Sequence, residues 1–210
     1  IKQASGFILY VTCILSLSCS KTDPGTAQPP SGGPNVYVAG FESNGTVNVA
    51  KYWKNGTAIT LGSGGIQASL AYGITVSGSN DVYVAGYESI GPGSIAKYWK
   101  NGTAVNLTDG SRHAAVYAIV VVGNDVYAAG NEINASGISV AKYWKNGTAV
   151  PLTDGTWAAY GIAMAVSGSD VYVVGYESQP LGSAIVKYWK NGIPSSLTNG
   201  SRFAEPSSIV

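Results

Sequence analysis

The sequence is dominated by a six-residue motif, Lys-Tyr-Trp-Lys-Asn-Gly, that occurs four times at almost constant spacing. Its tryptophans are separated by 46, 45 and 45 residues and are Trp53, Trp99, Trp144 and Trp189. A second motif, Asp/Asn-Val-Tyr, precedes each copy and begins at Asn35, Asp81, Asp125 and Asp170. Repeats of about 40 to 50 residues are typical of propellers and solenoids, in which each unit buries its faces against its neighbours.

Each period contains four short segments rich in β-branched and aromatic residues, which predict four strands. In the second copy these segments are residues 72–76, 82–87, 95–99 and 103–107. Asn101-Gly102 separates the last two and favours a tight hairpin turn, because both residues tolerate positive φ. Pro151 and Pro194 place the fourth strand at a sheet edge, because proline cannot donate a ladder hydrogen bond. The sequence therefore predicts an all-β, β-propeller-like fold with four-stranded antiparallel blades of about 45 residues.

The order of short motifs within one period carries a family resemblance. Trp-x-Asn-Gly is followed by Leu-x-x-Gly at residues 107–110, and Ala-Tyr-Gly-Ile at residues 71–74 is followed by Val-x-x-Gly. This order resembles the extracellular HAF-type repeats of bacterial proteins and the Tyr-Trp-Lys-Asn-Gly repeats of exported lipoproteins from Bacteroidetes-like bacteria. The resemblance covers residues 35–210. It implies an extracellular propeller-like repeat and supplies no catalytic residues.

The first 34 residues differ in composition from the repeats. An apolar run at residues 6–17 follows Lys2, so residues 1–18 are predicted to be a lipoprotein signal peptide. Leu17-Ser18-Cys19 resembles a bacterial lipobox, which makes Cys19 the predicted lipidation site. Residues 19–34 are then the lipidated cysteine and a flexible Pro/Gly/Ser tether. An unlipidated secretory signal is the alternative; the favoured location is the outer membrane or cell surface, with the lipid anchor as the only membrane contact.

The repeat spacing also predicts the blade boundaries. The blades are expected near residues 35–66, 67–113, 114–158 and 159–203, with a further blade beginning at 204–210. The first blade begins at its second strand, because proline-rich sequence occupies the place of the first. Since propellers have about four to eight blades, the chain is interpreted as a fragment of a larger ring. The alternative is a four-bladed ring in which residues 207–210 complete the first blade.

Composition excludes several classes of function. The net charge is +1, and eight of the twelve basic residues belong to the repeated motif, so no basic patch for nucleic acid is predicted. Both cysteines, Cys13 and Cys19, precede the repeats, which leaves the repeats without a disulfide. His113 is the only histidine, and the sequence contains no Gly-x-Ser-x-Gly elbow and no metal-binding motif. No catalytic residues, metal or cofactor are therefore predicted.

The loops between strands divide into a constant set and a variable set. Because antiparallel strands alternate in direction, the loops after the second and fourth strands share one edge, and these loops vary among the copies. Variable loops on a rigid scaffold are common binding sites, and aromatic and arginine side chains are common anchors. The candidate ligand-binding residues are Arg112, His113, Trp157, Arg202 and Phe203.

The residues repeated in every copy are interpreted as structural. The four motif tryptophans are either sugar-stacking platforms or packing between blades, and packing is favoured. A glutamate at the end of each second strand is predicted to pair with the first lysine of the motif. These pairs are Glu42 with Lys51, Glu88 with Lys97, Glu132 with Lys142, and Glu177 with Lys187.

Three functions remain open from the sequence. The favoured one is a non-catalytic extracytoplasmic lipoprotein recognition module that binds a glycan or a protein through the variable loops. The alternative is an accessory propeller of a surface polysaccharide-degrading enzyme whose catalytic residues lie beyond residue 210. The third is a purely architectural spacer.

Overall fold

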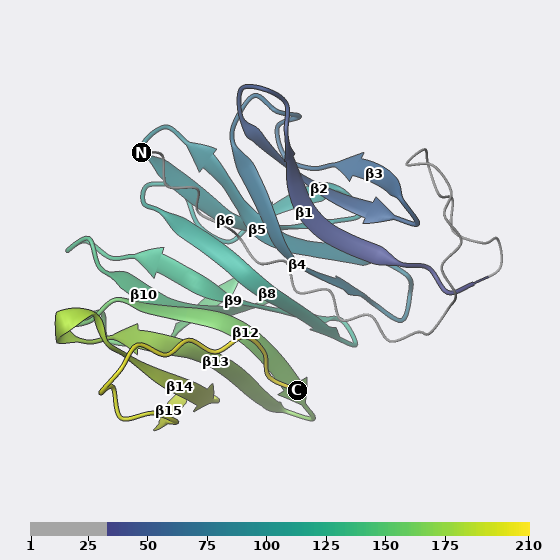
Figure 1. The fold of residues 1–210 in the computed structure, drawn as a ribbon. Coiled ribbons are helices and arrows are strands. Elements are labelled where there is room, and N and C mark those ends of the chain that lie inside the picture. The colour runs from purple at the N-terminus through teal and green to yellow at the C-terminus, as the bar shows by residue number, and fades with distance from the viewer. Residues whose placement is uncertain (1–32) are drawn as a thin grey trace, which may run out of the picture.

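The structure, a computed structural model, describes residues 33–210 (Figure 1). The predicted signal peptide, Cys19 and most of the predicted tether lie outside the described residues. Within residues 33–210, all regular structure is β-strand apart from one short 3₁₀ helix, η1 (Pro180–Gly182). No helix of this part of the chain has the length and apolar character needed to cross a membrane.

The strands form four antiparallel sheets in which neighbours in sequence are neighbours in the sheet. Sheet 1 contains β1 (Tyr37–Ser43), β2 (Asn48–Lys54) and β3 (Thr57–Thr60). Sheet 2 contains β4 (Ser69–Val76), β5 (Val82–Ile90), β6 (Gly93–Lys100) and β7 (Thr103–Asn106). Sheet 3 contains β8 (Ala114–Val122), β9 (Asp125–Ile133), β10 (Ser139–Lys145) and β11 (Thr148–Pro151). Sheet 4 contains β12 (Ala159–Ser167), β13 (Asp170–Ser178), β14 (Ala184–Lys190) and β15 (Ile193–Ser196).

The predicted all-β fold and the four-strand period are thus confirmed, with three strands in the first copy. The first strand of sheet 2 is longer than predicted, because pairing with β5 extends from Val76 back to Ser69. The prolines lie where expected, since Pro151 and Pro194 belong to the edge strands β11 and β15.

The Asn-Gly turns form as the sequence predicts. In all four copies, the asparagine has φ of 50° or 51° and the glycine has φ between 82° and 85°. Two successive residues with positive φ match the twist of a two-stranded hairpin. The last two strands of every sheet therefore pair in one register, as in Trp144 opposite Ala149 in sheet 3.

A second glycine position is required by close backbone packing. In sheets 2, 3 and 4 the first strand carries a β-bulge, for example between Val116 and Ala118, opposite a glycine of the second strand. A Cβ atom on Gly130 would lie 1.9 Å from the carbonyl oxygen of Ala115. Only glycine permits this approach, which is why each copy keeps a glycine there.

The sheets pack face to face in chain order, and the motif tryptophans fill the junctions between them. Trp99 is buried with residues of sheets 1 and 2, Trp144 with residues of sheets 2 and 3, and Trp189 with residues of sheets 3 and 4. Figure 1 shows the first strands β4, β8 and β12 succeeding one another through this stack, and β8 contacts both of the others. Trp53, on the outer face of sheet 1, is only half-buried.

Candidate functional site

One edge of the sheets, termed here the constant edge, carries the Asn-Gly turns. In sheet 3, Asn146 Oδ1 accepts a hydrogen bond from the Val126 amide (2.9 Å), and Asn146 Nδ2 donates to Asp125 Oδ1 (2.8 Å). Lys145 pairs with Asp125 at 3.1 Å and lies over the Tyr127 ring. Sheets 2 and 4 repeat all these contacts with the equivalent residues. Every side chain of this edge thus has an internal partner already.

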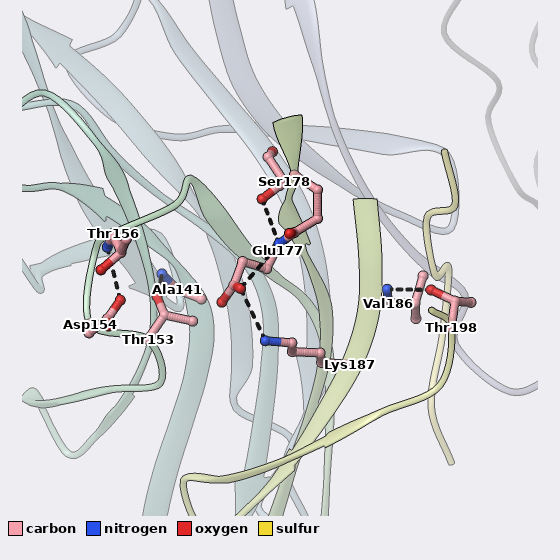
Figure 2. Close-up of polar contacts among 10 residues, drawn as sticks. Ala141, Thr153, Asp154, Thr156, Glu177, Ser178, Val186, Lys187 and Thr198 are labelled. Atoms are coloured by element: carbon pink, nitrogen blue, oxygen red, sulfur yellow. Dashed lines mark hydrogen bonds and ion pairs between the residues drawn. The ribbon is translucent and has the colours of Figure 1, made fainter. Parts of the chain in front are cut away.

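The opposite edge, termed the variable edge, carries the connections between sheets. In the β11–β12 connection, Thr153 Oγ1 accepts a hydrogen bond from the Ala141 amide (3.3 Å), and Asp154 Oδ1 accepts one from the Thr156 amide (2.9 Å), as Figure 2 shows. The connection after β7 and the segment after β15 have the same two contacts. The repeat therefore fixes the backbone of these segments and leaves the next side chains free to differ.

The candidate ligand-binding residues lie at two equivalent positions of these segments. Arg112, Trp157 and Arg202 occupy the first position, and His113 and Phe203 occupy the second. All five side chains are exposed. They belong to successive segments, and of the five only Trp157 lines the larger pocket described next.

A pocket of about 410 Å³ lies between the β11–β12 connection and sheet 4. One wall is formed by Asp154, Thr156 and Trp157, and the other by Glu177 of β13 and Lys187 of β14. Its remaining lining residues are Leu152, Thr153, Trp189 and Pro194. Figure 2 shows Asp154 and Thr156 on the connection, across from Glu177 and Lys187. The pocket therefore combines an exposed indole with carboxylate, hydroxyl and ammonium groups.

The charges of this pocket are partly neutralised. Lys187 Nζ lies 3.1 Å from Glu177 Oε1, and both side chains are largely buried. The Thr156 amide and hydroxyl hydrogen-bond to Asp154 and lower the pKa of its carboxyl group, so Asp154 is ionised at neutral pH. Asp154 is thus the carboxylate of the pocket without a cation at salt-bridge distance. A ligand would meet a hydrogen-bond acceptor there together with an aromatic surface.

The predicted glutamate–lysine pairs form in all four sheets. The pairs of sheets 2, 3 and 4 are mostly shielded from solvent. A smaller pocket of about 150 Å³ lies beside the pair of sheet 1 and is lined by Asn44 and Lys51 among others, without an aromatic residue. The pocket beside Trp157 is therefore the better candidate site.

The sequence did not single out Asp154, Thr156, Glu177 or Lys187 as ligand-binding residues. The segment 153–157 resembles the Asp-box of sialidase propellers, but it follows the fourth strand instead of the third, and the likeness was interpreted as coincidence. Glu177 and Lys187 recur in every copy, which favoured a structural role. The signal that marks this site is the single non-motif tryptophan, Trp157.

A row of tyrosines on the first two strands of the sheets was also missed. Tyr72 and Tyr117 have ring centroids 5.2 Å apart across sheets 2 and 3, and Tyr160 and Tyr176 are 5.1 Å apart within sheet 4. Burial raises the pKa of Tyr72 to about 12 and raises that of Tyr117 as well. These phenols stay neutral at physiological pH and pack against one another, so the row is interpreted as structural.

Within residues 33–210, no group of three or more His, Cys, Asp or Glu side chains is arranged to hold a metal ion. No protein-family model matches the chain, and no curated protein matches it. The proposal that follows therefore depends on the geometry of the variable edge and on the sequence patterns.

Proposed function

We propose that the four sheets are blades of an extracytoplasmic β-propeller that binds a carbohydrate at its variable edge. The observation that carries this proposal is the exposed Trp157 ring beside a pocket with polar groups on both walls. The face-to-face sheets, with a tryptophan of one blade packed against the previous blade, support the propeller.

The chemistry of the pocket suits a neutral sugar. Ligand sites combine apolar or aromatic surface with a few placed polar groups, and a sugar ring has an apolar face and a rim of hydroxyl groups. Trp157 offers the face on which such a ring stacks. Asp154 accepts hydrogen bonds from sugar hydroxyls, while Thr156 and Lys187 are able to donate them.

The state of Asp154 favours binding over hydrolysis at this pocket. A glycosidase needs a protonated carboxyl group of raised pKa as its general acid. The pKa of Asp154 is lowered instead, because its carboxylate is bound by the Thr156 amide and hydroxyl groups. The pocket is thus suited to holding a glycan without cleaving it, in line with a recognition module or an accessory blade of a longer enzyme.

The leader sequence adds the cellular setting to the proposal. Export and lipidation at Cys19 would hold the propeller at the outer membrane or cell surface, and residues 20–34 would act as a spacer. Contact with the membrane would be limited to the lipid. A tethered module of this kind captures polymers at the surface of the cell.

The proposal is tested by measuring binding to immobilised neutral oligosaccharides of glucose, mannose and galactose. Replacing Trp157 with Ala is expected to lower affinity by about tenfold or more, since aromatic anchors typically contribute about 1.4 kcal/mol or more. The matched control is Val122→Ala at the constant edge, because Val122 is 44% exposed and Trp157 is 43% exposed. If no oligosaccharide binds, or if both variants bind as well as the unaltered protein, the proposal is wrong.

A further inference from the structure

The two outer faces of the stack are each half of a junction that occurs three times inside it. At an internal junction, the tryptophan and two second-strand residues of the later sheet pack against the earlier sheet and against the leucine that follows its last strand. The junction of sheets 1 and 2 contains Trp99, Val82 and Val84 from sheet 2 and Leu61 from the connection. Sheet 1 presents the first half of this arrangement outward, and sheet 4 presents the second half.

Exposure shows that both halves are uncovered. Val84 is 1% exposed, whereas its equivalent Val38 in sheet 1 is 44% exposed. Val36 is exposed in the same way, and Trp53 is only half-buried. At the other end, Leu197 is 59% exposed, whereas its equivalents Leu61 and Leu152 are 1% and 7% exposed. An apolar surface of this kind in an otherwise packed molecule marks an interaction site.

The strand pattern completes the match between the two ends. Sheet 1 has three strands, and in the described part of the chain the outer edge of β1 has no strand beside it. The segment after β15 begins like an internal connection, with the Val186 amide donating to Thr198 Oγ1 (3.0 Å) and Phe203 packed on the Tyr176 ring. Figure 1 shows this segment running along sheet 4 toward the C-terminus. Residues 204–210 thus stand where the next sheet would have its first strand.

We propose that the outer face of sheet 1 docks on the outer face of sheet 4 of a second copy of this chain. The contact reproduces the internal junction, with Trp53, Val36 and Val38 of one copy against Leu197 of the other. It also brings residues 204–210 of one copy alongside β1 of its partner. The contact is head to tail, so it propagates into a ring or an open stack. This inference rests on the repeated junction and is independent of carbohydrate binding.

Sedimentation velocity of the full chain over a range of concentrations tests self-association. Species larger than a monomer are expected to increase with concentration. The double variant Val38→Lys/Leu197→Lys is expected to shift the distribution to monomer, because it places charges in the apolar contact. Both residues are exposed, so the fold is expected to survive, and circular dichroism checks this. A protein that is monomeric throughout, or association that persists in the double variant, overturns the proposal.

Disulfide trapping tests which faces meet. In a chain with Cys13 and Cys19 replaced by Ser, Val38→Cys protein is mixed with Leu197→Cys protein under mild oxidation. Docking raises the local concentration of the two thiols, so the mixed dimer is expected to form about tenfold faster or more than in the control. The control mixes Val38→Cys with Val122→Cys, whose exposure is the same. Equal rates in the two mixtures overturn the proposed pairing of faces.

Discussion

The constant and variable edges of the sheets use the repeat in different ways. At the constant edge the four copies share both backbone and side chains, and the turn asparagine bonds the strand beside it in all of them. At the variable edge the copies after sheets 2, 3 and 4 share the braced backbone but present Arg112, Trp157 and Arg202 in turn. Stability needs the contacts of one edge, whereas the other edge needs only a fixed platform.

The largest effect that separates the two edges is expected from glycines of positive φ. A Cβ on Gly155 would lie 2.5 Å from Asn134 Nδ2 and 3.0 Å from Val140 Cγ2, whereas a Cβ on Gly147 meets nothing within 4 Å. Gly155→Ala adds crowding to backbone strain and is expected to cost about 2–4 kcal/mol, against about 1–2 kcal/mol for Gly147→Ala. Denaturant titration of both variants measures this; equal losses would show that the platform of the variable edge is loosely packed.

The next effect concerns the turn asparagine of the constant edge. Asn146→Ala removes a residue suited to positive φ and also its two hydrogen bonds, so it is expected to lower the unfolding free energy by about 2 kcal/mol. Asn146→Gly keeps the backbone freedom and is expected to cost about 1 kcal/mol. Urea midpoints of the two variants separate the two contributions. Identical midpoints would mean that the side-chain bonds alone account for the loss.

A smaller effect is expected at Trp157 on the variable edge. The ring is exposed, and its connection is held by the bonds of Thr153 and Asp154. Trp157→Ala is expected to change the unfolding free energy by less than about 0.5 kcal/mol. Thermal unfolding checks this in the same samples as the binding assay. A large loss of stability would contradict the separation of roles between the edges.

The smallest effects are expected from pH, at both edges. Hydrogen bonds from Asn146 and Lys145 lower the pKa of Asp125, and those from Thr156 lower that of Asp154. A carboxyl group whose pKa is lower in the folded than in the unfolded state stabilises the fold above its unfolded pKa, and this is lost as pH falls through its folded pKa. The stability difference between the unaltered protein and Asp125→Asn is therefore expected to shrink in acid. Chemical denaturation in a pH series measures it; a difference that grows in acid would reverse the assignment.

High salt should distinguish the two carboxylates. Asp125 pairs with the exposed Lys145, and such surface pairs are screened by salt. Asp154 is bound mainly by the Thr156 amide and hydroxyl groups, which carry no net charge. The effect of Asp125→Asn on stability is expected to diminish in high salt, while that of Asp154→Asn persists. Equal salt dependence would indicate that the two edges hold their carboxylates alike.

Sequence-based prediction succeeded where the cause is local. The Asn-Gly turns follow from the φ preferences of two adjacent residues, and the edge strands follow from the missing amide of Pro151 and Pro194. The pairing of Glu177 with Lys187 followed from a short hairpin between them. It failed for the tyrosine row, because Tyr72 and Tyr117 meet across two sheets and no spacing along one strand predicts that contact.

By itself the sequence determined the strands, their order within each sheet and the side chains at the variable edge, because these depend on residue type and on spacing within one repeat. Only the tertiary structure decided which of those side chains has a pocket. Trp157 lies 20 residues from Glu177 and 30 from Lys187, and the three line one pocket because the connection after sheet 3 lies against sheet 4. Burial of the tryptophans was decided in the same way. Trp53 and Trp189 stand in the same motif, and only Trp189 has a preceding sheet to cover it.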